Sequence, residues 1–361
     1  MIGPLDSRWD DPNLIPLSNG PQRSATPPGS PSVTLQADGL LIEYLLPYPM
    51  HIIDDHPWPP LRCVLGNRLL EFEKPRSVLQ PFEPAGRMGN ESPDAFCSIL
   101  RVYSSHIDRN FPLTAEDAWP LAESLLTWIR VKARHYWVLE GVAGFASLFR
   151  GSVFAQHAGQ REQQNFASYG RIVIVRPLSR DLWKSIETEL VNRSSAPVSE
   201  SIFCDALTSI VANDDAKAVL ELGVAAEIEL TRLLDEVSLA DPQSKEKETY
   251  RKLQRQRRWP KFSEKLSHWP RRLGLGRSED FQPSSFPPDW VRMVKSLYML
   301  RNSIAHSGIL PPSVAPVSAQ LFATNALFAY CRQERVRLGL SVYTLPPNEL
   351  AFGQLVASIG G

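Results

Sequence analysis

The segment DAKAVLELGVAAEIELTRLLDEV, residues 215–237, decides how the second half of this chain folds. Its apolar residues recur at steps of three and four positions, which is the repeat of one face of an α-helix. The residues of this stripe are Val219, Leu222, Ala226, Leu230, Leu233 and Val237. The segment therefore predicts a long helix with one buried side.

Further helices are expected on both sides of this segment. Residues 202–211 form a candidate helix upstream, and Pro287-Pro288-Asp289 begins a helix that Gly308 ends. A final helix is expected over residues 317–335. These elements predict an all-α helical domain at residues 194–335, followed by a C-terminal tail at residues 336–361.

The first half of the chain has a β pattern instead. Asp38-Gly39 and Gly66-Asn67 each separate two short apolar runs, and such dipeptides favour tight hairpin turns. The remaining expected elements are strands at 98–103 and 171–175, a helix that Thr114 caps, and a helix over 179–190. Residues 34–193 therefore predict one domain with an antiparallel sheet, of unknown function. The fold class expected for the whole chain is α+β.

Composition excludes several classes of protein. The chain of 361 residues is neutral, with 39 basic and 39 acidic residues, so any affinity for nucleic acid has to come from a local patch. Its four cysteines lie far apart, which fits a reducing cytoplasm better than a disulfide framework or a zinc ribbon. With no signal-peptide pattern and no run of about 18 apolar residues, we expect a cytoplasmic protein that does not span a membrane. Residues 1–33 hold seven of the 31 prolines and are expected to form a disordered tail.

One local patch is strongly basic. Residues 245–277 contain twelve basic residues and three glutamates, with Trp259, Phe262 and Trp269 between them. Phosphate groups are attracted to such patches. The RNA-binding residues expected from this segment are Arg251, Lys252, Arg255, Arg257, Arg258 and Lys261. The alternative is a solvated segment whose tryptophans pack on the helical domain.

The segment LRNSIAHSG, residues 300–308, joins a fixed cation to a group that titrates near neutral pH. At 100° per residue, Asn302 and His306 share one face of the expected helix, almost opposite an apolar face. Arg301 lies between that face and a second apolar group, which includes Tyr298. This second group needs cover, and we expect it from the other domain or from a second copy of the chain.

Arg301-Asn302 followed by His306 at the end of a helix resembles the motif of the HEPN superfamily (higher eukaryotes and prokaryotes nucleotide-binding domains). Residues 214–220 and Ala225-Ala226-Glu227 resemble the early helix of the Apea-like and related bacterial HEPN groups. The resemblance implies a helical bundle that dimerises through the motif face. It also implies a metal-independent endoribonuclease of a toxin–antitoxin or other defence system, with an antitoxin or defence partner.

On this resemblance Arg301, Asn302 and His306 take the catalytic positions, and Glu227 takes a supporting acidic position. Their chemistry fits, because cleavage of RNA without a metal uses the 2′-hydroxyl as nucleophile. Histidine can move a proton near pH 7, and arginine can hold phosphate oxygens as negative charge builds. Two proton transfers are needed, and two copies of the chain would supply two histidines.

Two other functions stay open. In the first, the helical domain is a non-catalytic module for RNA binding or dimerisation. In the second, residues 34–193 sense a small ligand or a foreign protein. His51 and His56, with Asp54 and Asp55 between them, have suitable ligand types for a metal but no third cluster nearby. We therefore expect neither a metal nor a cofactor. His306 also has a purely structural interpretation, as a cation beside the end of a helix dipole.

Overall fold

The computed structural model describes the chain in several stretches. They are residues 32–36, 39–46, 50, 52, 58–66, 68–81, 94–104, 113–139, 178–212, 214–240, 244–256, 258, 260–281, 288–308 and 317–340. Most of the proline-rich segment, the expected strand at 171–175, the histidines at 51 and 56, and Arg257 lie outside the described residues.

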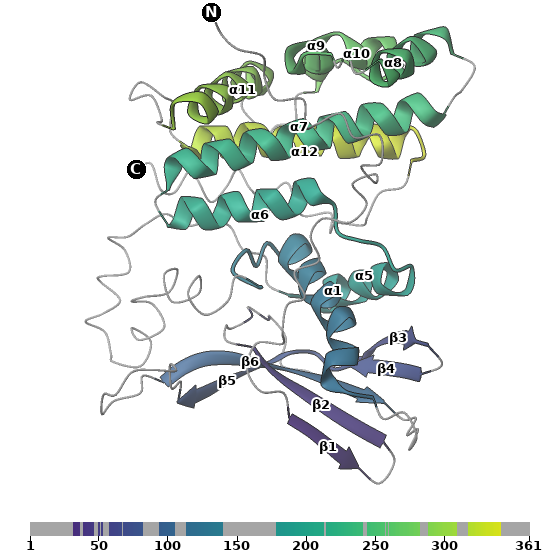
Figure 1. The fold of residues 1–361 in the computed structure, drawn as a ribbon, viewed down its shortest axis with the longest axis vertical. Coiled ribbons are helices and arrows are strands. Elements are labelled where there is room, and N and C mark those ends of the chain that lie inside the picture. The colour runs from purple at the N-terminus through teal and green to yellow at the C-terminus, as the bar shows by residue number, and fades with distance from the viewer. Residues whose placement is uncertain are drawn as a thin grey trace, which may run out of the picture.

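An antiparallel sheet of six strands forms the N-terminal part (Figure 1). Its strands are β1 (Ser32–Gln36), β2 (Gly39–Leu46), β3 (Leu61–Leu65), β4 (Arg68–Phe72), β5 (Arg76–Pro81) and β6 (Asp94–Ser104). They are ordered β1-β2-β6-β4-β3, and β5 also pairs with β6. Both expected hairpins are present, as β1–β2 and β3–β4. The fold class is therefore α+β, as the sequence predicts.

The central strand β6 carries one partner on one edge and two on the other. It pairs with β2 along residues 98–104, while β4 and then β5 follow one another along the opposite edge. Glu73 continues the ladder of β4, because its backbone N–H donates to the carbonyl of Arg101 at 3.0 Å. Pro75, which has no N–H to donate, separates β4 from β5.

Two helices, α1 (Ala115–Ala133) and α5 (Arg180–Val191), pack against the sheet (Figure 1). Thr114 caps α1 as expected, in a reciprocal pair of hydrogen bonds with Asp117. The buried hydroxyl of Tyr44 on β2 donates to the carbonyl of Ala115 at 2.5 Å. This bond fixes the start of α1 over the sheet.

The rest of the described chain is helical. It contains α6 (Val198–Val211), α7 (Asp215–Ala240), α8 (Lys245–Arg255), α9 (Phe262–Ser267), α10 (Trp269–Arg272), α11 (Trp290–Ser307) and α12 (Val317–Arg337), with a 3-10 turn at Ser278–Asp280. Helix α7 lies at the centre and packs against α6, α8, α9, α11 and α12. All six residues of its predicted stripe are buried. The prediction made from residues 215–237 is therefore confirmed.

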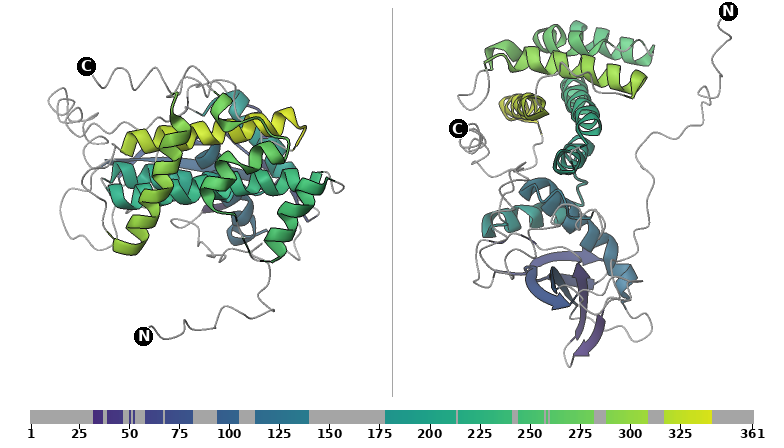
Figure 2. Two further views of the ribbon diagram at one scale, coloured as in Figure 1. Left: turned by 90° about the horizontal axis from the view of Figure 1, so that it is seen from above. Right: turned by 90° about the vertical axis from the view of Figure 1, so that its left-hand side faces the viewer.

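The helices form layers above the sheet. Helix α6 lies next to α1 and α5, then come α7 and α12, and α8 to α11 form the outermost layer (Figure 1). Helix α11 runs across α7 and α12 rather than alongside them (Figure 2). No helix in the described stretches is long and apolar enough to cross a membrane.

The sheet part and the helical part share one core. The end of α1 is joined to α6 by two ion pairs, Arg130–Asp205 at 2.7 Å and Arg134–Glu200 at 2.5 Å, and the second pair is fully buried. Buried apolar side chains continue from the sheet through α1 and α6 to α7 and α12. The packing is therefore continuous across residue 193, where the sequence predicts a domain boundary.

Candidate functional site

Helix α11 carries the Arg-Asn-His segment at its C-terminal end. Its buried side faces the core with Val294, Leu297 and Ile304, whereas His306 is exposed and Asn302 is partly exposed. The helix ends at Gly308, which has a positive φ of 71° and donates its N–H to the carbonyl of Ile304 at 2.7 Å. Asn302 and His306 thus lie on the outer side of the helix, as the angular spacing predicts.

Arg301 points towards α7. Its Nη1 lies 3.0 Å from Oε2 of Glu227 and also donates to Oδ1 of Asn302 at 3.2 Å. Its guanidinium lies 5.6 Å from the centre of the Tyr298 ring. The structure therefore brings together Arg301, Asn302 and the expected supporting residue Glu227, and it fixes the arginine from three sides.

A glycine on α7 lets α11 come this close. A methyl group placed on Gly223 would lie 2.8 Å from Cβ and 2.9 Å from Cγ of Arg301, which is closer than side-chain carbons approach each other. The stem of Arg301 therefore packs directly on the backbone of α7. From there its guanidinium can reach Glu227, one helical turn further along.

Lys265 on α9 is a member of this site that the sequence prediction missed. It is buried, donates to Oγ1 of Thr231 at 2.9 Å, and lies 4.0 Å from Oε1 of Glu227. Burial lowers the pKa of Lys265, and the charges of Glu227 and Asp235 oppose that shift. Glu227 therefore bridges two cations, one from α9 and one from α11. One signal in the sequence distinguishes Lys265 from the other cations of the segment. Phe262, Lys265 and Leu266 have the spacing of residues on one buried helix face.

The second apolar side of α11 is covered by α9. The ring of Tyr298 stacks on Phe262, with ring centres 4.7 Å apart and planes inclined by 17°. The cover thus comes from the basic segment of the same helical part, not from the sheet part. Further along the helix, Met299 is 71% exposed and Ala305 is also exposed. This end of α11 presents apolar surface beside His306.

The basic segment folds into α8, α9 and α10. Arg251 and Arg255 pair with Glu248, at 3.1 and 3.4 Å, whereas Lys252 and Arg258 are exposed. Lys261 is exposed too. Trp269 is buried and contacts Tyr250 edge to face, with ring centres 4.9 Å apart. For Trp269 the alternative interpretation is correct, since this aromatic side chain packs inside the helical part.

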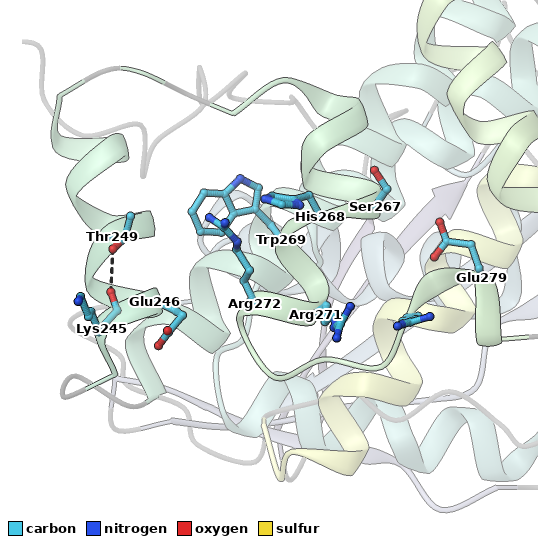
Figure 3. Close-up of a pocket in the computed structure, with 10 residues that line it drawn as sticks. Lys245, Glu246, Thr249, Ser267, His268, Trp269, Arg271, Arg272 and Glu279 are labelled. Carbon is cyan, nitrogen blue, oxygen red and sulfur yellow. Dashed lines mark hydrogen bonds between the residues drawn. The ribbon is translucent and has the colours of Figure 1, made fainter.

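A cleft of about 960 Å³ opens between α8 and the α9–α10 segment (Figure 3). Its lining includes the cations Lys245, Arg271, Arg272 and Arg277 and the carboxylates of Glu246 and Glu279. None of the five described residues among those expected to bind RNA lines it. The role of those residues in RNA binding stays a prediction.

The site on α11 therefore consists of an exposed histidine, a carboxamide and an arginine held by a carboxylate. The imidazole of His306 can accept or donate a proton at the surface. Arg301 keeps a permanent positive charge close to that surface. Among the described residues no group of three or more histidine, cysteine, aspartate or glutamate side chains is arranged to hold a metal ion.

No model of a known protein family matches the chain, and no curated protein or solved structure matches it.

Proposed function

We propose that the chain is a metal-independent endoribonuclease of HEPN type. The observation that carries this proposal is the geometry of α11, where His306 is exposed one turn beyond Asn302 and the carboxamide contacts a fixed Arg301. In this assignment His306 moves the proton of the 2′-hydroxyl or of the leaving 5′ oxygen. Arg301 stabilises the charge that builds on the phosphate.

Glu227 acts in this proposal as a positioning residue. It holds the guanidinium of Arg301 at 3.0 Å, so the arginine loses little side-chain freedom when RNA binds. The cation then acts by its field and by the N–H groups that Glu227 and Asn302 leave unused. Glu227 also lies 4.0 Å from Nζ of Lys265, so two cations share this carboxylate.

The second proton transfer needs a second histidine, and a homodimer through α11 supplies it. Exposed Met299 and Ala305 support this arrangement, since exposed apolar side chains on the part of α11 that carries His306 are suited to an interface between copies. We place the enzyme in the cytoplasm, in a defence or toxin–antitoxin setting in which a partner protein restrains it. The buried free thiols of Cys63, Cys204 and Cys331 fit a reducing compartment.

The test is cleavage of single-stranded RNA in the presence of EDTA, with wild type and His306→Ala side by side. We expect wild type to leave 2′,3′-cyclic phosphate ends and His306→Ala to be slower by about 10²–10⁴-fold. Ser296→Ala is the matched control, because Ser296 is an exposed residue of the same helix and should leave the rate unchanged. Equal cleavage by wild type and His306→Ala would refute the proposal.

A second candidate is a helical module that binds RNA without cutting it. The ion pair between Arg301 and Glu227 favours this candidate, because a guanidinium that already faces a carboxylate is less available to a phosphate. This candidate predicts binding that weakens with salt, no cleavage product, and no effect of His306→Ala. The same two proteins in the same assay therefore separate the two functions.

A further inference from the structure

The cleft between α8 and the α9–α10 segment lies apart from the residues of α11. Its cations come from several elements, with Lys245 on α8, Arg271 and Arg272 on α10, and Arg277 in the loop after α10. Figure 3 shows Arg271 and Arg272 around a hollow that Lys245 and Glu279 flank from opposite ends. Convergence of charge from separate elements indicates a built surface rather than the solvated side of one helix.

Most of these cations do not form ion pairs that would stabilise the fold. Neither Lys245 nor Arg271 nor Arg277 forms an ion pair with another residue in the described stretches. Several other arginines of the helical part are paired, as Arg251 is with Glu248 and Arg335 with Glu236. Three unpaired cations at one hollow carry a cost in mutual repulsion, which an anionic ligand would offset.

Packed aromatic side chains form the floor of the cleft. Trp269 is buried against Tyr250, and the guanidinium of Arg272 lies 5.7 Å from the centre of the Trp269 ring. This contact holds the planar head of Arg272 at the edge of the hollow, with His268 beside it (Figure 3). A fixed guanidinium is suited to the planar, two-point recognition of phosphate oxygens.

The size and charge of the cleft define its ligand. A volume of about 960 Å³ is at the upper end of the range for small-molecule sites, so it holds more than a single phosphate. Four cations outnumber the two carboxylates, which favours an anionic ligand. A ligand with at least two phosphate groups fits both the space and the charge.

We propose that this cleft binds ligands with two or more phosphate groups, through Lys245, Arg271, Arg272 and Arg277. The phosphates belong either to a free polyphosphate, such as the triphosphate of a nucleotide, or to successive nucleotides of an RNA strand. The proposal concerns binding only, so it holds whether or not α11 cleaves RNA.

The experiment uses the full chain and two probes. One probe is inorganic triphosphate, measured by calorimetry. The other is a fluorescent single-stranded 2′-O-methyl RNA of about ten nucleotides, measured by anisotropy, which cannot be cut because it lacks the 2′-hydroxyl nucleophile. The test variant combines Arg271→Gln with Arg277→Gln, and both residues are exposed. The control combines Arg180→Gln with Lys184→Gln, two exposed residues of α5, which removes the same charge outside the cleft.

We expect the test variant to bind on the order of a hundredfold more weakly than wild type, because each charge-assisted phosphate contact accounts for roughly tenfold. The control should lose less than about threefold. The slope of log affinity against log salt for the RNA should fall by about 1.4 in the test variant, as two strand phosphates lose their partners. Lys245→Gln, on a different helix, should weaken the same probes, so the result does not depend on one pair of substitutions.

The two probes distinguish the source of the phosphates. Binding of both, with competition between them, shows a site that accepts either source. Binding of RNA alone assigns the cleft to a strand, and binding of triphosphate alone assigns it to a free polyphosphate. The proposal is overturned if neither probe binds, or if the test and control variants weaken binding to the same extent. Neither probe offers a 2′-hydroxyl nucleophile, so this test measures binding alone and stays separate from the nuclease assay.

Discussion

Glu227 is the residue on which the geometry of the α11 site depends, since it faces Arg301 at 3.0 Å and Lys265 at 4.0 Å. The perturbation we consider is Glu227→Gln, which keeps the shape of the side chain and removes its charge. It is combined with Arg301→Gln in a double-mutant cycle, which isolates the energy of the pair from the effects of each substitution alone.

The expected coupling follows from distance and exposure. Two unit charges 3.0 Å apart attract by roughly 5 kcal/mol at an effective dielectric constant of about 20, before the cost of removing them from water. Both side chains keep about a quarter of their surface exposed, so water screens the pair. Exposed pairs contribute about 0–1 kcal/mol, and breaking a buried pair costs about 3–5 kcal/mol. We expect a coupling energy of about 1.5 kcal/mol for this intermediate case.

The assay is urea unfolding followed by circular dichroism, which gives the free energy of unfolding of wild type, both single variants and the double variant. Glu227→Gln should lose more stability than Arg301→Gln, because it also deprives buried Lys265 of an anionic neighbour. A coupling energy below about 0.3 kcal/mol, or the reverse order of the single variants, would refute the claim that Glu227 holds Arg301 in place.

Two further predictions concern buried charge. Arg335→Met leaves Glu229, which is buried and otherwise accepts from Ser199 at 2.6 Å, without its arginine, and should cost about 3–5 kcal/mol in urea unfolding. The exposed pair Arg62–Glu71 is the control, and Arg62→Met should cost less than about 1 kcal/mol; equal losses would contradict this reasoning. The second prediction compares wild type with Lys265→Met. Burial lowers the pKa of Lys265 below its ordinary value of 10.5, so the unfolded chain binds more protons at this lysine than the folded chain does. The free energy of unfolding of wild type should therefore rise relative to that of Lys265→Met as the pH rises towards 10.5. A difference that stays constant between neutral pH and pH 10.5 would show that Lys265 is not desolvated.

Sequence alone predicts those elements whose residues repeat regularly. The stripe from Val219 to Val237 sets α7, and the dipeptides at 38–39 and 66–67 set both hairpins. Strand β5 was missed because RSVLQP, residues 76–81, has little alternation and ends in proline. It is a strand because β6 is eleven residues long and offers an edge beyond the end of β4. The strand is stabilised by pairing with β6, and no local sequence pattern shows that contact.

The candidate site was predictable in the same limited sense. A count of helical angles places Asn302 and His306 on the outer side of α11, because that depends on one helix alone. The direction of Arg301 depends on Gly223, a residue 78 positions earlier whose missing side chain admits α11. Lys265 and the cleft depend on how short helices fold back on one another, so neither follows from spacing within a single segment.

The cations of the helical part fall into two groups, and this division bears on how the proposed function would work. Arg301 is held by Glu227 on the helix that carries an exposed histidine. Lys245, Arg271 and Arg277 form no ion pair with any residue that the structure describes, and they line a separate hollow. A held cation adds little to binding but can stabilise charge that forms in place, since its position is set before the reaction begins. Unpaired cations gain a partner when an anion arrives, and so contribute mainly to affinity. On the proposed assignments, substitutions in the cleft should therefore change the RNA concentration needed for half-maximal rate. Substitutions at His306 and Arg301 should instead lower the maximal rate, because binding and chemistry rest on different elements of the helical part.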